Sequence, residues 1–147
     1  MKLLLLIGFI GFGLNAFSQT SPVGKWKTID DETNQPKSII EIFEKDGFLY
    51  GKIEKLFRKT EEDQNPKCDK CSGSQKDQLI IGMQILNSLK KDSDVKWSGG
   101  EILDPNNGKT YSCKIMLTED GKKLEVRGFI GFSLLGRTQV WNREPAN

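Results

Sequence analysis

The residues with the most distinctive chemistry are three cysteines, two of which are separated by only two residues. Cys68 and Cys71 lie in a loop-like stretch, and Cys113 stands alone in an alternating segment. A Cys-x-x-Cys pair can serve as a redox site, as half of a zinc site or as a disulfide. No thioredoxin-like pattern and no fourth metal ligand accompany the pair, which favours a structural disulfide. It joins Cys68 to Cys71, or one of them to Cys113, and we expect Cys113 to be unpaired because its neighbours imply burial.

Two arginines beside glycines, Arg127 and Arg137, form the second feature with chemical potential. If their side chains point inward, their forked N–H groups can bind a carboxylate or phosphate head group. An inward arginine is costly unless it is paired or faces a polar cavity. In the alternative interpretation, Arg137 packs over the ring of Trp26 and Arg127 is a solvated strand residue.

The acidic residues form clusters that we interpret as turns and solvated loops. The turn at residues 104–108, together with Glu101, offers oxygen ligands but lacks the spacing and terminal glutamate of an EF-hand. Its side chains are expected to form hydrogen bonds with the backbone of the same turn. The runs at residues 30–32 and 61–63 contain adjacent acids and identify no general base. The sequence therefore predicts no metal site, no cofactor and no catalytic residue.

Aromatic residues gather mainly in the second half of the chain. The set consists of Trp97, Tyr111, Phe129, Phe132 and Trp141. In a barrel these side chains could line an apolar pocket for a small hydrophobic molecule. They could equally fill the interior, because eight strands enclose a space only just wide enough for side chains. The sequence leaves both possibilities open.

The overall composition excludes several classes of function. The chain has 147 residues, 22 of them basic and 20 acidic, and it contains no histidine. Without histidine there is no Ser-His-Asp or Cys-His nucleophile, no histidine-ligated zinc and no proximal-histidine haem. The formal charge of +2 argues against a dedicated nucleic-acid binder. The length suits one domain of ordinary size.

The N-terminal residues are typical of a secretory signal peptide. Lys2 precedes an apolar run at residues 3–14, and the small residues Ala16 and Ser18 follow it. Cleavage before Gln19 would remove residues 1–18 and leave a single domain, residues 19–147, in the periplasm or outside the cell. The apolar run is short for a membrane span, and we expect no span in the mature form.

Apolar residues in the mature chain recur mostly with a period of two, which is typical of strands. Residues 38–44 and 48–56 predict two strands joined by an Asp46-Gly47 hairpin turn. Residues 95–103 predict a strand with a bulge at Gly99-Gly100, and residues 111–117, 124–130 and 137–143 predict three more. Residues 79–89 fit either a strand at 80–83 or helical turns at 83–89. About eight strands and at most one short helix indicate an all-β barrel or sandwich.

The first strand opens with a motif that resembles lipocalin-type barrels. Gly24 and Trp26 form its Gly-x-Trp. The resemblance implies that the tryptophan closes one end of the barrel and that a basic residue of the last strand covers its ring. Arg137 and Arg143 both lie in the predicted last strand, with Trp141 between them, and either could supply that partner.

A longer set of segments resembles the exported bacterial family known as domain of unknown function 2147. The segments are residues 24–26, 37–39, 46–53, 68–71, 99–111, 127–131 and 136–141, and they cover nearly all of the mature chain. The resemblance implies a lipocalin-like antiparallel β-barrel of about eight strands. It implies no reaction, cofactor or catalytic residue.

Together these observations predict an exported, non-enzymatic binding protein for a small amphipathic or hydrophobic molecule. The apolar body would lie against Trp97, Tyr111 and Phe129, and an anionic head would face Arg127 or Arg137. The alternative is an envelope structural or protein-interaction module with a filled barrel. An exposed apolar patch at residues 129–135 would favour that alternative.

Overall fold

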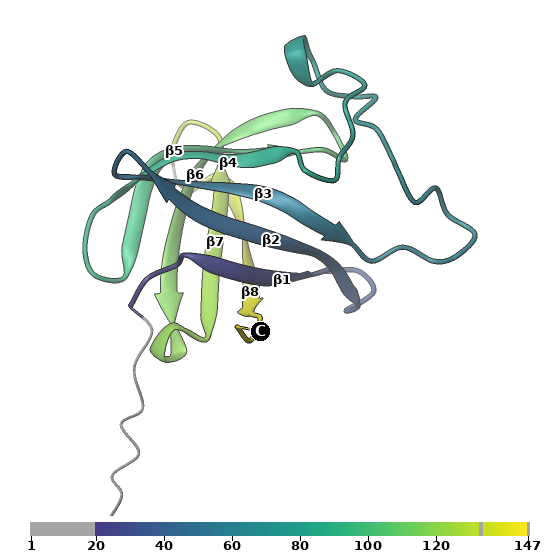
Figure 1. Ribbon diagram of the computed structural model, residues 1–147. Helices are drawn as coiled ribbons and strands as arrows, with labels where there is room; N and C mark the ends of the chain where they lie inside the picture. Colours follow the sequence, from purple (N-terminus) through teal and green to yellow (C-terminus); the bar gives the residue numbers. More distant parts are fainter. Residues whose placement is uncertain (1–19, 133, 147) are drawn as a thin grey trace, which may run out of the picture.

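Eight antiparallel strands close into a barrel in the computed structural model, which describes residues 20–132 and 134–146 (Figure 1). Each strand pairs with the next in sequence, and β8 pairs with β1. The strands are β1 (Gly24–Ile29), β2 (Pro36–Lys45), β3 (Phe48–Leu56), β4 (Gln84–Lys91), β5 (Lys96–Asp104), β6 (Lys109–Thr118), β7 (Lys123–Phe129) and β8 (Gly136–Arg143). The predicted all-β barrel is confirmed, and the predicted signal peptide lies outside the described residues.

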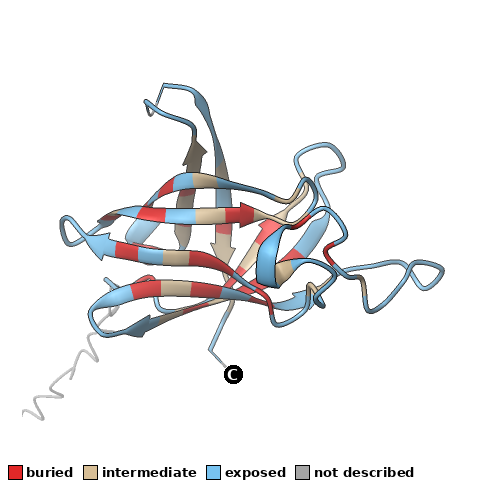
Figure 2. Cartoon of the chain, turned by 90° about the horizontal axis from the view of Figure 1, so that it is seen from above, coloured by how far each residue is buried: buried red, intermediate tan, exposed pale blue. Residues whose placement is uncertain are grey.

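Helical structure in the described residues is limited to two single 3-10 turns, η1 (Gly73–Gln75) and η2 (Glu119–Gly121). No helix in this part of the chain is long and apolar enough to cross a membrane. Whether a side chain points inward or outward is therefore determined almost entirely by its position in a strand. Figure 2 shows buried positions alternating with more exposed ones along the strands.

The alternation of apolar and polar residues fixes the register of the best-predicted strands. Ile115 on β6 lies opposite Val126 on β7, and Leu117 lies opposite Leu124. All four of these side chains are buried, because neighbouring residues on one face of paired strands point to the same side of the sheet. A register slip of one residue would expose them all.

Two local features predicted from the sequence are confirmed. Asp46 and Gly47 both have positive φ, at 52° and 81°, as a two-residue type I′ hairpin requires. The register of β5 against β6 shifts between Trp97 and Gly100, where a bulge was expected.

The structure resolves the ambiguity at residues 79–89 in an unexpected way. Residues 83–89 are not helical and residues 80–83 are not a strand, because β4 begins at Gln84 and pairs with both β3 and β5. Ser88 has a φ of 56°, which interrupts the strand alternation. The register of β4 against β3 also shifts on both sides of the Gly51–Leu86 pair. Ile85, Leu86 and Leu89 are all buried, and their spacing imitates the apolar face of a helix.

The interior of the barrel has two halves with different packing. The closed end is formed by residues 20–23 and by the β2–β3, β4–β5 and β6–β7 connections, whereas the mouth is formed by the other four connections. Near the closed end the interior is filled, and near the mouth it is open. The side chains of the filled half include Trp26, Ile42, Leu49, Leu89, Trp97, Ile115, Leu117 and Leu124.

Candidate ligand-binding cavity

A cavity of about 760 Å³ occupies the half of the barrel nearer the mouth. Its size falls in the range typical of pockets for small molecules. Buried apolar side chains from six strands line it: Ile40, Ile53, Ile85, Leu103, Val126 and Trp141. The sequence left open whether the barrel contains a pocket or is filled by side chains. In the structure the half nearer the mouth contains a pocket, and the half nearer the closed end is filled.

Charged side chains reach the cavity only where it opens to solvent. Those that line it are Lys37, Arg58, Glu62, Asp104 and Arg137, and each is exposed or only half-buried. The apolar wall and the charged rim therefore occupy different depths. An amphipathic molecule is divided in the same way, into an apolar end that matches the wall and a polar end that matches the rim.

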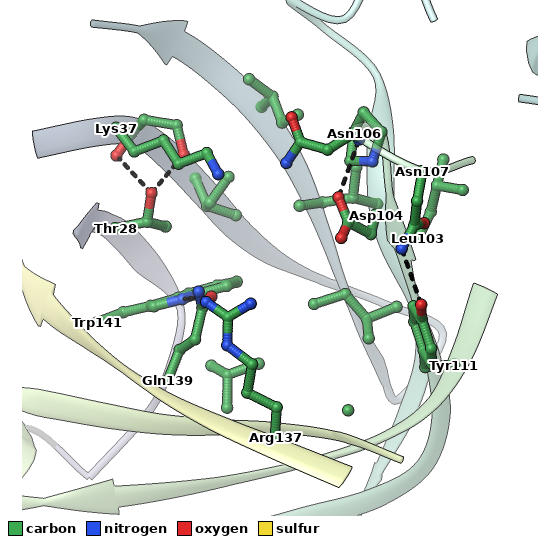
Figure 3. A pocket seen from close by; sticks show the side chains of 18 of the residues that line it. Thr28, Lys37, Leu103, Asp104, Asn106, Asn107, Tyr111, Arg137, Gln139 and Trp141 are labelled. Atoms are coloured by element: carbon green, nitrogen blue, oxygen red, sulfur yellow. Dashed lines mark hydrogen bonds between the residues drawn. The ribbon is translucent and has the colours of Figure 1, made fainter. Parts of the chain in front are cut away.

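A hydrogen-bonded chain runs up the inward face of β8 to the mouth (Figure 3). Trp141 Nε1 donates to Gln139 Oε1 at 3.4 Å, and Gln139 Nε2 donates to Asp31 Oδ2 at 3.2 Å. The same oxygen of Asp31 forms an ion pair with the guanidinium of Arg137. Arg137, Gln139 and Trp141 share this face because alternate residues of a strand point to the same side. The connection between β1 and β2 supplies Asp31.

A second polar group lies on the neighbouring strands β1 and β2. The Thr28 and Ser38 hydroxyl oxygens are 2.6 Å apart, and both residues are buried. Thr28 Oγ1 also lies 3.5 Å from the Ser38 carbonyl oxygen, its second possible acceptor. The pair satisfies its own hydrogen bonds, so it adds polarity to the wall at little cost.

The β5–β6 turn forms a rigid part of the rim. Asp104 Oδ1 accepts a hydrogen bond from the Asn106 backbone N–H at 2.9 Å, and Asn107 Oδ1 accepts one from Lys109 N–H at 2.8 Å. Asn107 Nδ2 also donates to the Tyr111 hydroxyl at 2.8 Å. The prediction that this turn satisfies its own backbone is confirmed. The described residues contain no group of three potential metal ligands here or elsewhere.

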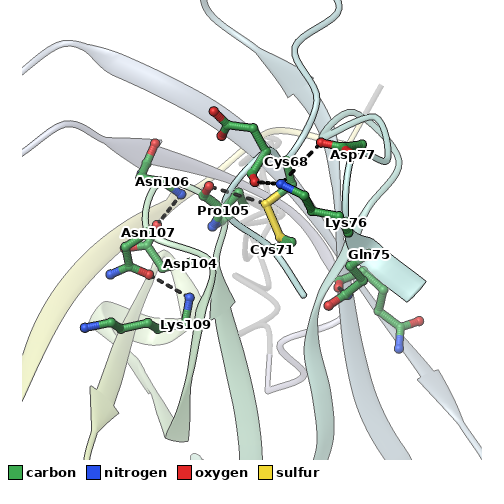
Figure 4. Close-up of a disulfide and its surroundings, with 12 residues drawn as sticks. Cys68, Cys71, Gln75, Lys76, Asp77, Asp104, Pro105, Asn106, Asn107 and Lys109 are labelled. Carbon is green, nitrogen blue, oxygen red and sulfur yellow. Dashed lines mark hydrogen bonds and ion pairs between the residues drawn. A yellow bond between two sulfur atoms is a disulfide. The ribbon is translucent and has the colours of Figure 1, made fainter. Parts of the chain in front are cut away.

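The predicted disulfide joins Cys68 to Cys71, with an S–S distance of 2.02 Å, and rests on the β5–β6 turn (Figure 4). Both cysteines are buried, and Cys68 Sγ lies 3.5 Å from the Pro105 carbonyl oxygen. Gly108 permits the close approach, because a Cβ there would be 1.9 Å from the Lys70 carbonyl oxygen. The disulfide therefore anchors the long β3–β4 connection to the rim of the cavity.

Arg143, and not Arg137, covers the ring of Trp26. The Arg143 guanidinium carbon lies 4.2 Å from the ring centroid, while Arg137 lies six residues away at the mouth. Trp26 is fully buried and its Nε1 donates to the Pro22 carbonyl oxygen at 2.8 Å. A Cβ at Gly24 would lie 3.2 Å from Arg143 Nη1, so the small residue leaves room for the guanidinium.

Three backbone carbonyls hold the Arg143 side chain in this position. Its Nε donates to Gly121 at 2.6 Å, Nη1 to Val23 at 3.1 Å and Nη2 to Ser21 at 2.6 Å. Burial lowers the pKa of Arg143, but the guanidinium stays protonated. The motif that resembles lipocalins thus works here through the last residue of β8.

The five predicted ligand-binding residues occupy different places. Tyr111 and Arg137 line the cavity, and Phe129 lies at its rim with its ring 5.8 Å from Lys114 Nζ. Trp97 is buried in the filled half, outside the residues that line the cavity. Arg127 lies between two inward residues of β7 and points outward, where its Nη1 donates to Thr138 Oγ1 at 3.1 Å. Their binding role remains a prediction, now best placed on Tyr111 and Arg137.

Sequence reasoning missed Asp31 and Gln139 as rim residues. Asp31 appeared only as one member of an acidic run, and Gln139 lies 108 residues away from it. The alternation of β8 could have placed Gln139 on the same face as Arg137. No pattern in the sequence indicates that Arg137 or Gln139 contacts Asp31, because these residues come together only when the barrel closes.

Cys113 is the free cysteine among the described residues, and it is buried as predicted. It lies opposite Gly100 on β5 and Gly128 on β7. Burial raises the pKa of Cys113 to about 12. Its thiol is therefore a small apolar group of the interior and not a nucleophile.

Comparisons with known proteins agree with the barrel. Residues 24–143 match the family described as "uncharacterized protein conserved in bacteria" (DUF2147). A solved structure described as "Protein HP1028 from the human pathogen Helicobacter pylori belongs to the lipocalin family" is similar, with a TM-score of 0.73 and 20% identity. The similarity covers 85% of this chain and 84% of that one. No curated protein matches the sequence significantly.

Proposed function

The chain belongs to the DUF2147 family and folds as a lipocalin-like barrel, and from this premise we propose that it is an exported, non-enzymatic carrier of a small amphipathic molecule. The apolar part of the molecule would occupy the cavity. Its anionic head would lie at the mouth beside Arg137. The buried disulfide supports an oxidising compartment, such as the periplasm or the extracellular space.

The division of the cavity into an apolar wall and a charged rim carries this proposal. A nonpolar ligand would gain from the wall alone, at about 25 cal/mol for each Å² of apolar surface removed from water. The charged side chains at the rim could additionally recognise a head group without entering the apolar interior. About 760 Å³ of open space in the half nearer the mouth argues against a completely filled barrel. The exposed apolar residues Ile130, Phe132, Leu134 and Leu135, which favour the protein-interaction alternative, are nevertheless present.

The ion pair between Arg137 and Asp31 explains how the head would be recognised. Asp31 occupies the guanidinium in the free protein, in the position that a ligand carboxylate could take. Both side chains are about half exposed or more, at 64% and 49%, so breaking their contact costs little. An incoming carboxylate would therefore exchange with Asp31 on the same forked donor.

Three ligands with the same alkyl chain and different heads would test the proposal. A saturated fatty acid, the corresponding alcohol and the corresponding alkyltrimethylammonium ion would each be titrated by calorimetry. We expect the carboxylate to bind a few-fold more tightly than the alcohol, because an ion pair with the exposed guanidinium of Arg137 contributes up to about 1 kcal/mol. The cationic ligand should bind most weakly.

Two rim variants should change the carboxylate affinity in opposite directions. Arg137→Gln removes the forked donor and should weaken binding of the fatty acid a few-fold, with little effect on the alcohol. Asp31→Asn removes the competing carboxylate and should strengthen fatty-acid binding several-fold. Head-group preference that is unchanged in both variants would contradict the assigned role of Arg137.

A cavity-filling variant would test the location of the apolar part. A Cβ at Gly128 would make ordinary contacts, the closest at 3.4 Å to Ile102, so Gly128→Leu can enter the cavity without a backbone clash. This variant should weaken all three ligands, whereas Ser112→Leu on the outer face should weaken none. Failure of the wild-type protein to bind any of the three ligands would overturn the carrier proposal.

A further inference from the structure

The connection between β7 and β8 exposes four large apolar side chains to solvent at the mouth. Ile130, Phe132, Leu134 and Leu135 are 63%, 83%, 88% and 71% exposed, and we call this group the apolar tip. Two backbone hydrogen bonds link described residues of the connection: Ile130 N–H donates to the Leu135 carbonyl at 3.0 Å, and Leu135 N–H donates to the Phe132 carbonyl at 3.1 Å. The turn therefore holds apolar side chains away from the core.

The apolar tip is continuous with the cavity. Ile130 and Leu135 are members of the tip and also line the cavity. In Figure 1 the β7–β8 connection and the η2 turn lie at opposite ends of the barrel, so the tip projects at the open end. A hydrophobic molecule could thus pass from the tip into the cavity along an apolar surface.

Basic residues flank the tip in sequence on both of its strands, and the nearest acidic residue along β7 is Glu125. Residues 126–139 contain Arg127 and Arg137 and no Asp or Glu. Lys114 lies opposite Arg127 on the outer face, and its ammonium group lies over the ring of Phe129. An apolar protrusion flanked by arginine and lysine is complementary to the interface of an anionic membrane. Arg137 forms an ion pair with Asp31 at the mouth, whereas Lys114 and Arg127 lie opposite each other on the outer face of β6 and β7.

The small area of the tip favours a lipid surface over a folded protein partner. The tip consists of four exposed apolar side chains on one short connection between two strands. A stable protein interface buries about 800 Å² on each partner and needs a matching surface around its centre. A bilayer interface accepts a narrow protrusion of any shape, because its acyl chains and head groups rearrange around it.

We propose that the apolar tip inserts into the interfacial region of membranes that contain anionic lipid, with Arg127 and Lys114 at the level of the head groups. Contact of this kind brings the mouth of the cavity to the bilayer. It goes beyond the carrier function, because membrane contact requires no ligand in the cavity.

Vesicle flotation with purified mature protein tests the proposal. One set of vesicles contains phosphatidylcholine alone, and in the other about a third of the lipid is phosphatidylglycerol. We expect binding to the anionic vesicles, with weakening at high salt because the charges are exposed and screened. The double variant Phe132→Ser/Leu134→Ser should bind at least about tenfold more weakly, since both side chains lose their apolar burial.

Two further variants separate the apolar contribution from the charge and from general surface hydrophobicity. Lys114→Gln/Arg127→Gln should reduce the preference for anionic over neutral vesicles about fivefold or more. Phe48→Ser/Val95→Ser removes two apolar side chains that are 38% and 43% exposed at the closed end, and it should bind like the wild type. Circular dichroism melting of every variant checks that the barrel is intact.

Three outcomes would overturn the proposal. Absence of flotation, or equal binding by wild type and the tip variant, would show that the tip does not contact lipid. Sedimentation of the wild type as a dimer that the tip variant converts to a monomer would assign the tip to a second copy of the chain. Loss of vesicle binding without loss of fatty-acid binding would leave the carrier function standing, and the reverse result would leave the membrane contact standing.

Discussion

The two ends of β8 place an arginine on the same inward face, yet the two arginines have different surroundings. Arg143, at the closed end, stacks over Trp26 and donates to three backbone carbonyls. Arg137, at the mouth, has an exposed ion pair with Asp31. One side chain joins the first and last strands into a seal, whereas the other can exchange its partner. The comparison teaches that the same residue type stabilises the barrel at one end and is available for recognition at the other.

The packing of the interior follows the same division. The bulky side chains of the filled half, including two of the three tryptophans, support the seal formed by Arg143. The cavity half leaves open space beside its inward side chains, and its charged residues lie at the rim. Stability should therefore depend mainly on the closed end, and ligand recognition mainly on the mouth.

Replacing each arginine by glutamine gives the largest expected contrast between the two ends. Arg143→Gln should lower the free energy of unfolding by about 2 to 3 kcal/mol, because it removes charge-assisted hydrogen bonds and the cation–π contact. Arg137→Gln should lower it by less than about 0.5 kcal/mol, because its ion pair is exposed. Urea unfolding followed by circular dichroism measures both.

Arg143→Lys provides the matched control for charge. Lysine keeps the cation but cannot make the forked hydrogen bonds, so this variant should lie between the wild type and Arg143→Gln. Equal destabilisation by Arg143→Gln and Arg137→Gln would contradict the division of roles between the two ends.

The mouth itself contains a rigid part and an open part, which two glycines distinguish. Gly108 and Gly131 have similar positive φ values of 72° and 66°. At Gly131 a Cβ would meet nothing within 4 Å, whereas at Gly108 it would overlap the Lys70 backbone. Gly131→Ala should lower the free energy of unfolding by about 1 kcal/mol, because alanine is strained at this positive φ. Gly108→Ala should cost about 1 to 2 kcal/mol more, because the disulfide segment must move away from the β5–β6 turn.

Urea unfolding and limited trypsin digestion together check this second contrast. Gly108→Ala should expose Lys67 and Lys70 of the β3–β4 connection to faster cleavage, and Gly131→Ala should leave the rate unchanged. If the two variants lose equal stability and are cleaved equally, the disulfide segment is not held by its contact with the turn.

Most of the fold could be predicted because its determinants are local. The period of two in β6 and β7 sets which side chains are buried, and Asp46-Gly47 sets a hairpin by its own backbone preference. The exception is β4, where the positive φ of Ser88 breaks the alternation and makes a strand look like a helix. No local rule predicts such a bulge, because it depends on pairing with β3 and β5.

The candidate site was less predictable because it depends on closure of the barrel. The sequence offered both Arg137 and Arg143 for Trp26, and only the β1–β8 register, which places Arg143 opposite Trp26, selects between them. Asp31 acquires its role from a residue more than a hundred positions away. The cavity depends on the summed volume of inward side chains in each half, which the number of aromatics does not give.

Cys113 provides the smallest expected effect and tests how far the open half extends. Gly128, its neighbour on β7, lines the cavity, whereas Cys113 is buried with a pKa raised from 9.0 to about 12. Between these values the unfolded chain loses the thiol proton and the folded chain keeps it, so stability falls as the pH rises above about 9. This contribution should lower the free energy of unfolding by about 1.4 kcal/mol at pH 10.

Urea unfolding of the wild type and of Cys113→Ala between pH 7 and about pH 10.5 would measure how much the Cys113 thiol contributes to the pH dependence of stability. The alanine variant is destabilised at neutral pH by its lost volume, but its stability should fall less steeply above pH 9 because it has no thiol to ionise. Iodoacetamide at pH 9 should label Cys113 slowly in the folded protein and rapidly in urea, since only the thiolate reacts. Fast labelling of the folded protein, with parallel pH profiles for the two proteins, would mean that cavity water reaches the thiol and that the filled half ends nearer the closed end than Cys113.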